Sequence, residues 1–164
     1  MSYVLQLAQV KSILNAVSNI GTVHDNVRWI KDSELFLAEF TKLIGTQKEI
    51  RAWIISRTGG TDEIGASVNA DGTRVSIPTG TRLRRYDWAI EGFMGFKDNS
   101  TEVDFQALVD AVIDAFKDKL TLNNTAMTRG SITYRIDHTF FSDNLCHHIL
   151  IQFYSVERDG ISPV

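Results

Sequence analysis

The sequence predicts a single α+β domain of 164 residues, in which a mainly antiparallel sheet has helices packed on one face and carries a protruding β-arm. Apolar residues recur at helical spacing in the segments that begin near Tyr3, Asp32 and Thr101. Other segments alternate apolar and polar residues or are continuously apolar, as strands are. A stretch over residues 58–81 is rich in Gly, Thr, Ser and Asp and predicts the arm.

An amphipathic helix is expected first, ending near Gly21. Its apolar stripe consists of Tyr3, Leu7, Val10, Leu14 and Val17. After it, Val23, Val27 and Trp29 alternate with polar residues. This alternation predicts a short strand from about Val23 to Ile30.

A second helix is expected between Asp32, a natural N-cap, and Gly45. Its stripe consists of Phe36, Leu37, Phe40, Leu43 and Ile44. Residues Glu49–Arg57 are apolar on both alternating faces, which indicates an interior strand. We expect the Thr-Gly-Gly-Thr run over 58–61 to end that strand.

The segment over 58–81 is much longer than the ~4–6 residues of a typical connection, so a flexible β-arm is predicted there. Its Asp-Gly pair at 71–72 is typical of a hairpin turn. The residue pairs expected around that turn are Val68 with Val75 and Ala66 with Ile77.

Arg82–Phe96 alternates most clearly and predicts the next strand. One face would carry Tyr86, Trp88, Ile90, Met94 and Phe96. Thr101 and Asp104 form a capping-box pair at the start of a helix that should run to Leu120. Its apolar stripe consists of Phe105, Leu108, Val109, Val112, Phe116 and Leu120.

Strands over Ser131–Phe141 and Leu145–Arg158 should close the fold as a hairpin through residues 142–144. The last strand is apolar on both faces, so both should be at least partly buried. Helices on one side of the sheet cannot cover both faces. Another subunit, or the first helices wrapping round, could supply the second cover.

Composition excludes several classes of protein. A hydrophobic share of 43% and a charged share of 23% are ordinary for a globular protein. A net charge of −3 argues against a protein whose main task is coating nucleic acid. The single cysteine, Cys146, cannot form an internal disulfide. With no signal-peptide pattern and no run of ~18 apolar residues, we expect neither export by a leader nor a membrane partner.

His138, Cys146, His147 and His148 are the residues that suggest a zinc site. If the hairpin turn centres on 143–144, His138 and His147 are diagonal neighbours about 7 Å apart on one face. His148 and Cys146 then point to the other face. Two ligands do not make a structural site, so we predict no metal and no cofactor. A small-molecule- or metal-binding domain using His138 and His147 remains a second hypothesis.

The other candidate chemistry is weak, so no enzyme is predicted. Cys146 and His147 are adjacent on a strand and would face opposite ways, which prevents proton transfer between them. The acids Asp104, Asp110, Asp114 and Asp118 fit a solvated helix face. The glycines near residue 60 complete no phosphate-binding motif.

The dense basic stretch comprises Arg74, Arg82, Arg84 and Arg85, at the mouth of the arm. A strand end leaving the core would present these cations to an acidic partner, either DNA phosphate or the carboxylates of another subunit. Charged residues that protect an edge strand against wrong pairing are the alternative.

The strand Tyr86–Gly92, the arm before it, the capped helix over 101–120 and the closing hairpin together resemble the tail terminator, or tail completion, proteins of long-tailed bacteriophages. The resemblance implies a virion protein, assembled in the host cytoplasm, whose subunits close into a ring, usually of six. Such a ring caps the head-proximal end of the tail tube and docks it to the neck or head connector. The arginines would then face the lumen, with non-specific contact to DNA, or an adjacent ring.

Two features exceed what small members of that family need. They are the helix expected over 32–44 and the length of the arm. Another neck component, such as a head-completion or stopper protein, is therefore the alternative function.

Overall fold

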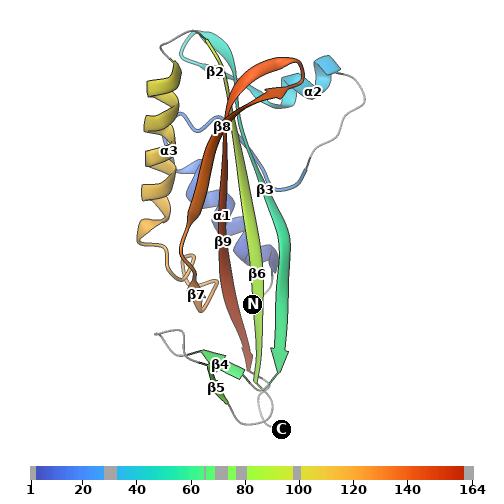
Figure 1. Ribbon diagram of the computed structural model, residues 1–164, viewed down its shortest axis with the longest axis vertical. Coiled ribbons are helices and arrows are strands. Elements are labelled where there is room, and N and C mark those ends of the chain that lie inside the picture. Colours follow the sequence, from blue (N-terminus) through green and yellow to red (C-terminus); the bar gives the residue numbers. More distant parts are fainter. Residues whose placement is uncertain are drawn as a thin grey trace.

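The computed structural model describes residues 3–27, 33–64, 66–68, 74–76, 81–97 and 101–160. The elements are α1 (Tyr3–Asn15), β1 (Thr22–His24), α2 (Ser33–Glu39), β2 (Thr41–Ile44), β3 (Gln47–Ile64), β4 (Ala66–Val68), β5 (Arg74–Ser76), β6 (Thr81–Gly95), α3 (Thr101–Lys117), β7 (Thr128–Arg129), β8 (Thr133–Phe141) and β9 (Asn144–Gly160). The molecule is elongated, and β3, β6 and β9 run side by side along it (Figure 1).

The fold is α+β with a mixed, mostly antiparallel main sheet, which confirms the predicted class. The strand order is β1-β3-β6-β9-β7, and β2 also pairs with β3 while β8 also pairs with β9. Among the described pairings, β1 with β3 is parallel and the others are antiparallel. No helix in the described part of the chain is long and apolar enough to cross a bilayer.

The main core lies between one face of the sheet and the helices α1 and α3. Leu14 of α1, Ile90 of β6 and Val112 of α3 are fully buried in one apolar cluster. Trp53 of β3 lies opposite Gly92 of β6, and a Cβ at Gly92 would lie 2.6 Å from the indole ring. The glycine is therefore needed to leave room for one of the two tryptophan rings of the core.

The second helix is shorter than predicted. It ends at Glu39, and Thr41–Ile44 forms β2, so the expectation of a helix to Ile44 is wrong. β2 and β3 form a hairpin around Gly45, whose φ of 61° favours glycine. Pairing with β3 overrides the helical spacing of the last apolar residues.

α2 covers the face of the sheet opposite to α1 and α3, so the expectation that all helices pack on one face is wrong for α2. Phe36 and Phe40 lie with their ring centroids 5.4 and 4.8 Å from that of Phe141, and Phe141 also contacts Phe93. Successive residues of a strand point to opposite faces, and Phe93 lies between residues of β6 that face α3. Phe93 therefore points to the face that α2 covers. The central strands are apolar on both faces, so both faces must be covered. Near α2, the second face is covered by the same chain rather than by another subunit.

β3 continues through the Thr-Gly-Gly-Thr run that was expected to end it. It pairs with β6 as far as Ile64, with a register shift between Arg57 and Gly59. A Cβ at Gly60 would lie 2.2 Å from the backbone oxygen of Arg85. Gly60 therefore allows two backbones to approach closely, and neither glycine forms a turn.

The remainder of the predicted arm contains the small β4–β5 hairpin, at the opposite end of the molecule from α2 (Figure 1). Its pairs are Ala66 with Ser76, Ser67 with Val75 and Val68 with Arg74, one residue away from the predicted register. The Asp-Gly turn at 71–72 lies outside the described residues. Of the strand expected over Val23–Ile30, the structure shows only β1. Residues 25–27 are not in a strand, and residues 28–32 lie outside the described part of the chain.

The later elements follow the prediction closely. α3 begins at Thr101 and ends at Lys117, which leaves Leu120 beyond the helix and exposed. β8 and β9 form the closing hairpin, but its turn is Ser142-Asp143, both with positive φ. The two-residue β7 is too short for its pattern to be recognised. Its Arg129 donates a hydrogen bond of 3.0 Å to the backbone oxygen of Phe116, in the last turn of α3.

Candidate functional site

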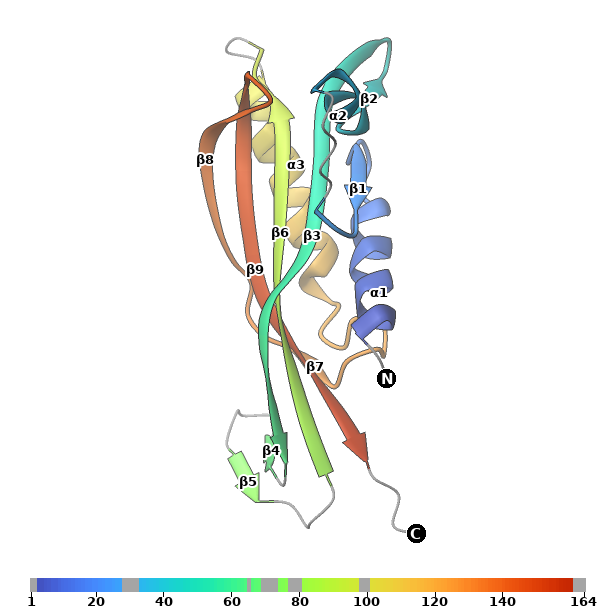
Figure 2. The same ribbon diagram turned by 90° about the vertical axis from the view of Figure 1, so that its right-hand side faces the viewer.

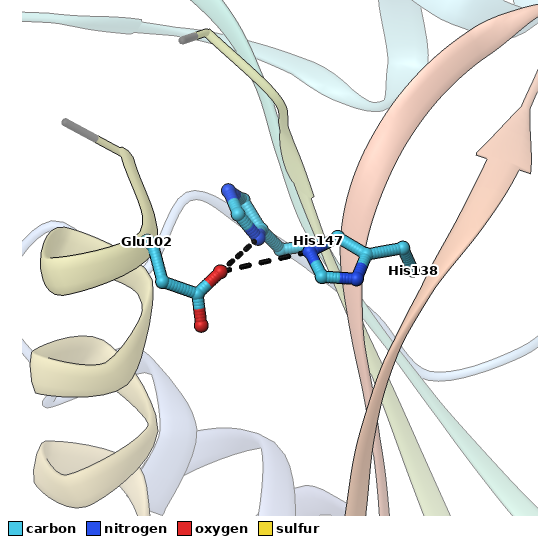
Figure 3. A group of neighbouring side chains, drawn as sticks. All are labelled: Glu102, His138 and His147. Carbon is cyan, nitrogen blue, oxygen red and sulfur yellow. Dashed lines mark ion pairs between the residues drawn. The ribbon is translucent and has the colours of Figure 1, made fainter. Parts of the chain in front are cut away.

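A glutamate and two histidines from different elements meet where α3 begins (Figure 3). Glu102 lies in the first turn of α3, His138 on β8 and His147 on β9. Because the β8–β9 turn has two residues, His138 lies directly opposite His147, with ring centroids 5.1 Å apart. The sequence-based expectation that these histidines are diagonal neighbours is therefore wrong.

The donor atoms of this Glu102–His138–His147 cluster all lie within 4.8 Å of one another. Oε2 of Glu102 is 3.0 Å from Nδ1 of His147 and 3.6 Å from Nε2 of His138. The side chain of His147 is 1% exposed, whereas those of His138 and Glu102 are 49% and 45% exposed. The cluster is anchored in the core on one side and open to solvent on the other.

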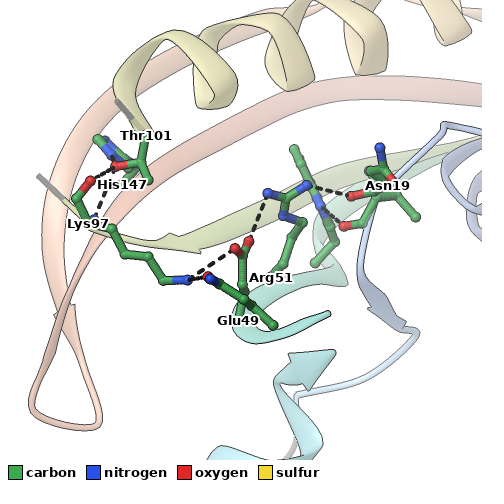
Figure 4. Close-up of polar contacts among 9 residues, drawn as sticks. Asn19, Glu49, Arg51, Lys97, Thr101 and His147 are labelled. Atoms are coloured by element: carbon green, nitrogen blue, oxygen red, sulfur yellow. Dashed lines mark hydrogen bonds and ion pairs between the residues drawn. The ribbon is translucent and has the colours of Figure 1, made fainter. Parts of the chain in front are cut away.

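Both ring nitrogens of His147 have polar neighbours. Nε2 lies 3.0 Å from Oγ1 of Thr101, which also lies 3.2 Å from the backbone oxygen of Lys97 (Figure 4). Nδ1 faces Oε2 of Glu102 at 3.0 Å. Which of these contacts donates depends on the ring nitrogen that carries the proton.

The environment shifts the pKa of both groups. Burial lowers the pKa of His147, and the nearby charge of Glu102 opposes this shift only in part. The amide of Gln106 donates a hydrogen bond of 2.8 Å to Glu102 and is the main cause that lowers the pKa of that carboxyl. A neutral imidazole and an ionised carboxylate therefore face each other at neutral pH.

The surroundings hold the cluster in place. The rings of Phe96 and Phe105 lie 4.9 and 5.1 Å from that of His147 and enclose it in apolar side chains. Nζ of Lys97 lies 3.1 Å from Glu49, which pairs with the buried Arg51 at 3.0 Å (Figure 4). This chain of polar contacts ties the start of α3 to β3.

Cys146 and His148 point to the other face, as predicted, and do not join the cluster. Nδ1 of His148 lies 2.6 Å from Oδ1 of Asp137. Cys146 is fully buried, and burial raises the pKa of its thiol to about 11, so it is protonated and unreactive. The acids predicted to lie on a solvated helix face are all exposed; they are Asp104, Asp110, Asp114 and Asp118.

The predicted arginine site lies at the far end of the sheet, where its side chains pair with acids of the same chain. Arg82 forms a two-pronged ion pair with Asp62 across β3 and β6, and Arg84 lies 3.7 Å from the same carboxylate. Arg85 pairs with Asp87 at 2.7 Å and lies over the ring of Tyr154. The side chain of Arg74 is outside the described residues.

An open pocket of about 440 Å³ lies beside these pairs. Its lining consists of Tyr3, Arg57, Gly60, Thr61, Asp62, Arg84 and Tyr86. At its base the hydroxyl of Tyr86 donates a hydrogen bond of 2.9 Å to the buried Glu157. Burial raises the pKa of Tyr86, so the phenol stays protonated. The lining carries Arg57 and Arg84 against Asp62, so charges of both signs meet in the pocket.

Sequence reasoning missed Glu102, because an acid in the first turn of a helix is explained by the helix dipole alone. Its position beside His147 depends on how α3 packs across β9. The one-residue error in the hairpin turn also hid the direct pairing of the two histidines.

A scan against models of protein families finds no match for this chain, and a search of curated proteins finds none either. Its function is therefore inferred from its own residues and their geometry.

Proposed function

We propose that this chain is a structural virion protein of a long-tailed bacteriophage, which closes into a ring, caps the head-proximal end of the tail tube and docks it to the neck or head connector. The resemblance of the strand over 86–92, the arm, the capped helix and the closing hairpin to tail terminator proteins supports the phage role. One observation supports the ring, namely that each of two opposite edges of the sheet carries exposed apolar residues.

The first edge is β8, which pairs with β9 on one side only among the described strands. We call its exposed apolar residues the β8 patch; they are Phe96, Tyr134, Phe140 and Leu145. Phe140 is 74% exposed and lies opposite Leu145 in the hairpin. An edge strand with unpaired backbone groups and exposed aromatic rings is suited to contact with another chain.

The second edge is formed by β1 and β2, with α1 and α2 beside them (Figure 2). We call its exposed apolar residues the β2 patch; they are Leu35 of α2 and Leu43 of β2. Leu43 is 61% exposed. This edge and the β8 edge lie on opposite sides of β3, β6 and β9.

The two patches differ in their residues and face away from each other. A two-fold dimer uses the same patch twice, whereas a ring uses two different patches on each subunit. The β8 patch of one copy would contact the β2 patch of the next. When the rotation between neighbouring copies is suitable, these repeated contacts close into a ring. A ring of six is the number that the resemblance implies.

The end of the sheet with the arginines and the β4–β5 hairpin would dock the ring to the next layer of the particle. Asp62 and Asp87 neutralise Arg82 and Arg85 in part, so this end offers less surplus positive charge than the sequence suggests. We therefore favour a protein subunit over DNA as the main partner there. Non-specific contact with DNA in the lumen would be secondary.

Light scattering with negative-stain imaging of the purified chain tests the ring. We expect a cyclic oligomer with a central hole, and a stable monomer or two-fold dimer at high concentration would contradict it.

Phe140→Lys and Leu43→Lys should each abolish the ring. When the two variants are mixed, one intact β8 patch and one intact β2 patch remain, so a heterodimer should form. Asp114→Lys, on the exposed face of α3, is the matched control and should still form rings.

Loss of this gene product in the phage that encodes it tests the role in the particle. We expect tail tubes of uncontrolled length and heads without tails by electron microscopy. Tubes of normal length that fail to join heads would instead indicate a head-completion or stopper protein. Replacing residues 66–76 with a Gly-Ser linker should keep the ring and abolish docking. This deletion spares residues 60–64, which pair with β6.

A further inference from the structure

We propose that Glu102, His138 and His147 form a binding site for a divalent transition-metal ion of the zinc class, independent of the role in assembly. Imidazole nitrogen and carboxylate oxygen are ligands that Zn²⁺ accepts. The set consists of Oε2 of Glu102, Nε2 of His138 and Nδ1 of His147. Each comes from a different element, so an ion held by all of them would join α3, β8 and β9.

The spacing of these atoms suits one ion. Zinc–nitrogen bonds of ~2.0–2.1 Å in tetrahedral geometry place neighbouring ligands about 3.3 Å apart. The observed separations of 3.0 and 3.6 Å from Glu102 to the two histidines lie on either side of that value. The remaining separation is within 4.8 Å and would close by a small rotation of His138, whose side chain is half exposed.

The position of His147 favours such a site. Nδ1 is buried and faces Oε2 of Glu102 at 3.0 Å. In the tautomer with the proton on Nε2, the hydroxyl of Thr101 accepts that proton and Nδ1 offers its lone pair beside the carboxylate. A cation between these two atoms would stabilise this tautomer.

The surrounding residues match what metal sites require. A histidine that binds a metal usually donates its other ring N–H to a fixed acceptor, and Thr101 supplies that acceptor here. Phe96 and Phe105 shield the ring of His147 from water on the buried side. The exposed side of Glu102 and His138 leaves room for water to complete a coordination shell of four.

Titration of tag-free, chelator-treated full-length protein with Zn²⁺, followed by calorimetry, tests the site. We expect saturable binding of one ion per chain. Co²⁺ should give the ligand-field absorption of a site with nitrogen and oxygen ligands, and Zn²⁺ should displace it. Glu102→Gln and His138→Ala change half-exposed side chains and should each weaken Zn²⁺ binding at least about tenfold.

Matched controls keep the test specific. Asp104→Asn changes an exposed acid in the same helical turn, and His148→Asn changes the neighbouring histidine on the other face. Both should leave the affinity unchanged. Absence of saturable binding, or binding that survives both Glu102→Gln and His138→Ala, would overturn the proposal and leave the His147–Glu102 contact as a hydrogen bond within the chain. Rings that still form in Glu102→Gln would separate this site from assembly.

Discussion

The two ends of β3, β6 and β9 are stabilised in different ways. At the histidine end, next to the Glu102–His138–His147 cluster, apolar side chains are buried on both faces, under α1 and α3 on one side and α2 on the other. At the arginine end, where β3 stops and β6 begins, both faces carry charged residues. The polar residues there include Asp62, Glu63, Arg82, Arg84 and Arg85.

This difference shows that one strand can obtain its stability from two sources along its length. Near Trp53 and Ile90 the dominant contribution is burial of apolar area. Near Arg82 the backbone ladder remains, but exposed ion pairs add little to it. We therefore expect the arginine end to open locally while the histidine end unfolds only with the whole domain.

The largest effect is expected at the core. Trp53→Ala removes a ring that is 1% exposed and its hydrogen bond of 2.9 Å to the backbone oxygen of Ile20, at a cost of about 3–5 kcal/mol in the free energy of unfolding. Urea unfolding measures it. Tyr134→Ala, at an exposed aromatic residue, should cost far less. Equal losses in these two variants would contradict the assignment of the core to this face.

A double-mutant cycle sharpens that prediction. Gly92→Ala should destabilise the native chain, since its Cβ would meet the Trp53 ring at 2.6 Å. The same change should be tolerated when Trp53 is already alanine, which gives a clear coupling free energy.

A smaller loss of stability is expected where β3 and β6 pair around Gly60. Gly60→Ala would place a Cβ 2.2 Å from the Arg85 oxygen and should cost about 1–3 kcal/mol. At Gly59 the nearest atom is 3.4 Å away, at the end of the Asp87 side chain, so Gly59→Ala is the control. Amide hydrogen exchange should rise over residues 60–64 in Gly60→Ala and stay slow around Trp53. Uniformly faster exchange would show that the two ends open together.

The smallest effect concerns the ion pair of Asp62. Its hydrogen bond with Arg82 lowers the pKa of this exposed carboxyl below 3.8. A lowered folded-state pKa means that the pair stabilises the fold above the unfolded-state value and that this contribution is lost as the pH falls through the folded-state value. In Arg82→Ala, the pKa of Asp62 measured by nuclear magnetic resonance should rise. An unchanged pKa would show that the pair is absent in solution.

Much of the fold follows from local patterns. The alternation over Arg82–Phe96 corresponds to a strand, β6, with nearly the predicted bounds. The helical spacing after Thr101 corresponds to a helix, α3, that also has nearly the predicted bounds. In these segments the local preference and the tertiary packing agree.

Prediction failed where contacts with residues distant in the sequence determine the local structure. Leu43 and Ile44 continue a helical stripe, yet pairing with β3 places them in a strand. Gly59 and Gly60 are typical turn residues, yet β6 binds them as a strand. For the candidate site, the histidines were identifiable by type, but the third ligand required knowing how α3 docks on β9. The arginines at 82, 84 and 85 lie on β6, and their acidic neighbours in the same chain were not foreseen.

The order of the strands in the sheet also sets the order in which the chain can fold. β6 lies between β3 and β9, and β9 follows every other described element in the sequence. Arg82 pairs with Asp159, so the sheet can close only after almost all of these residues have left the ribosome. Until then one side of β6 stays unpaired. Such non-local pairing slows folding and leaves the edge of β6 open to wrong pairing until β9 is available.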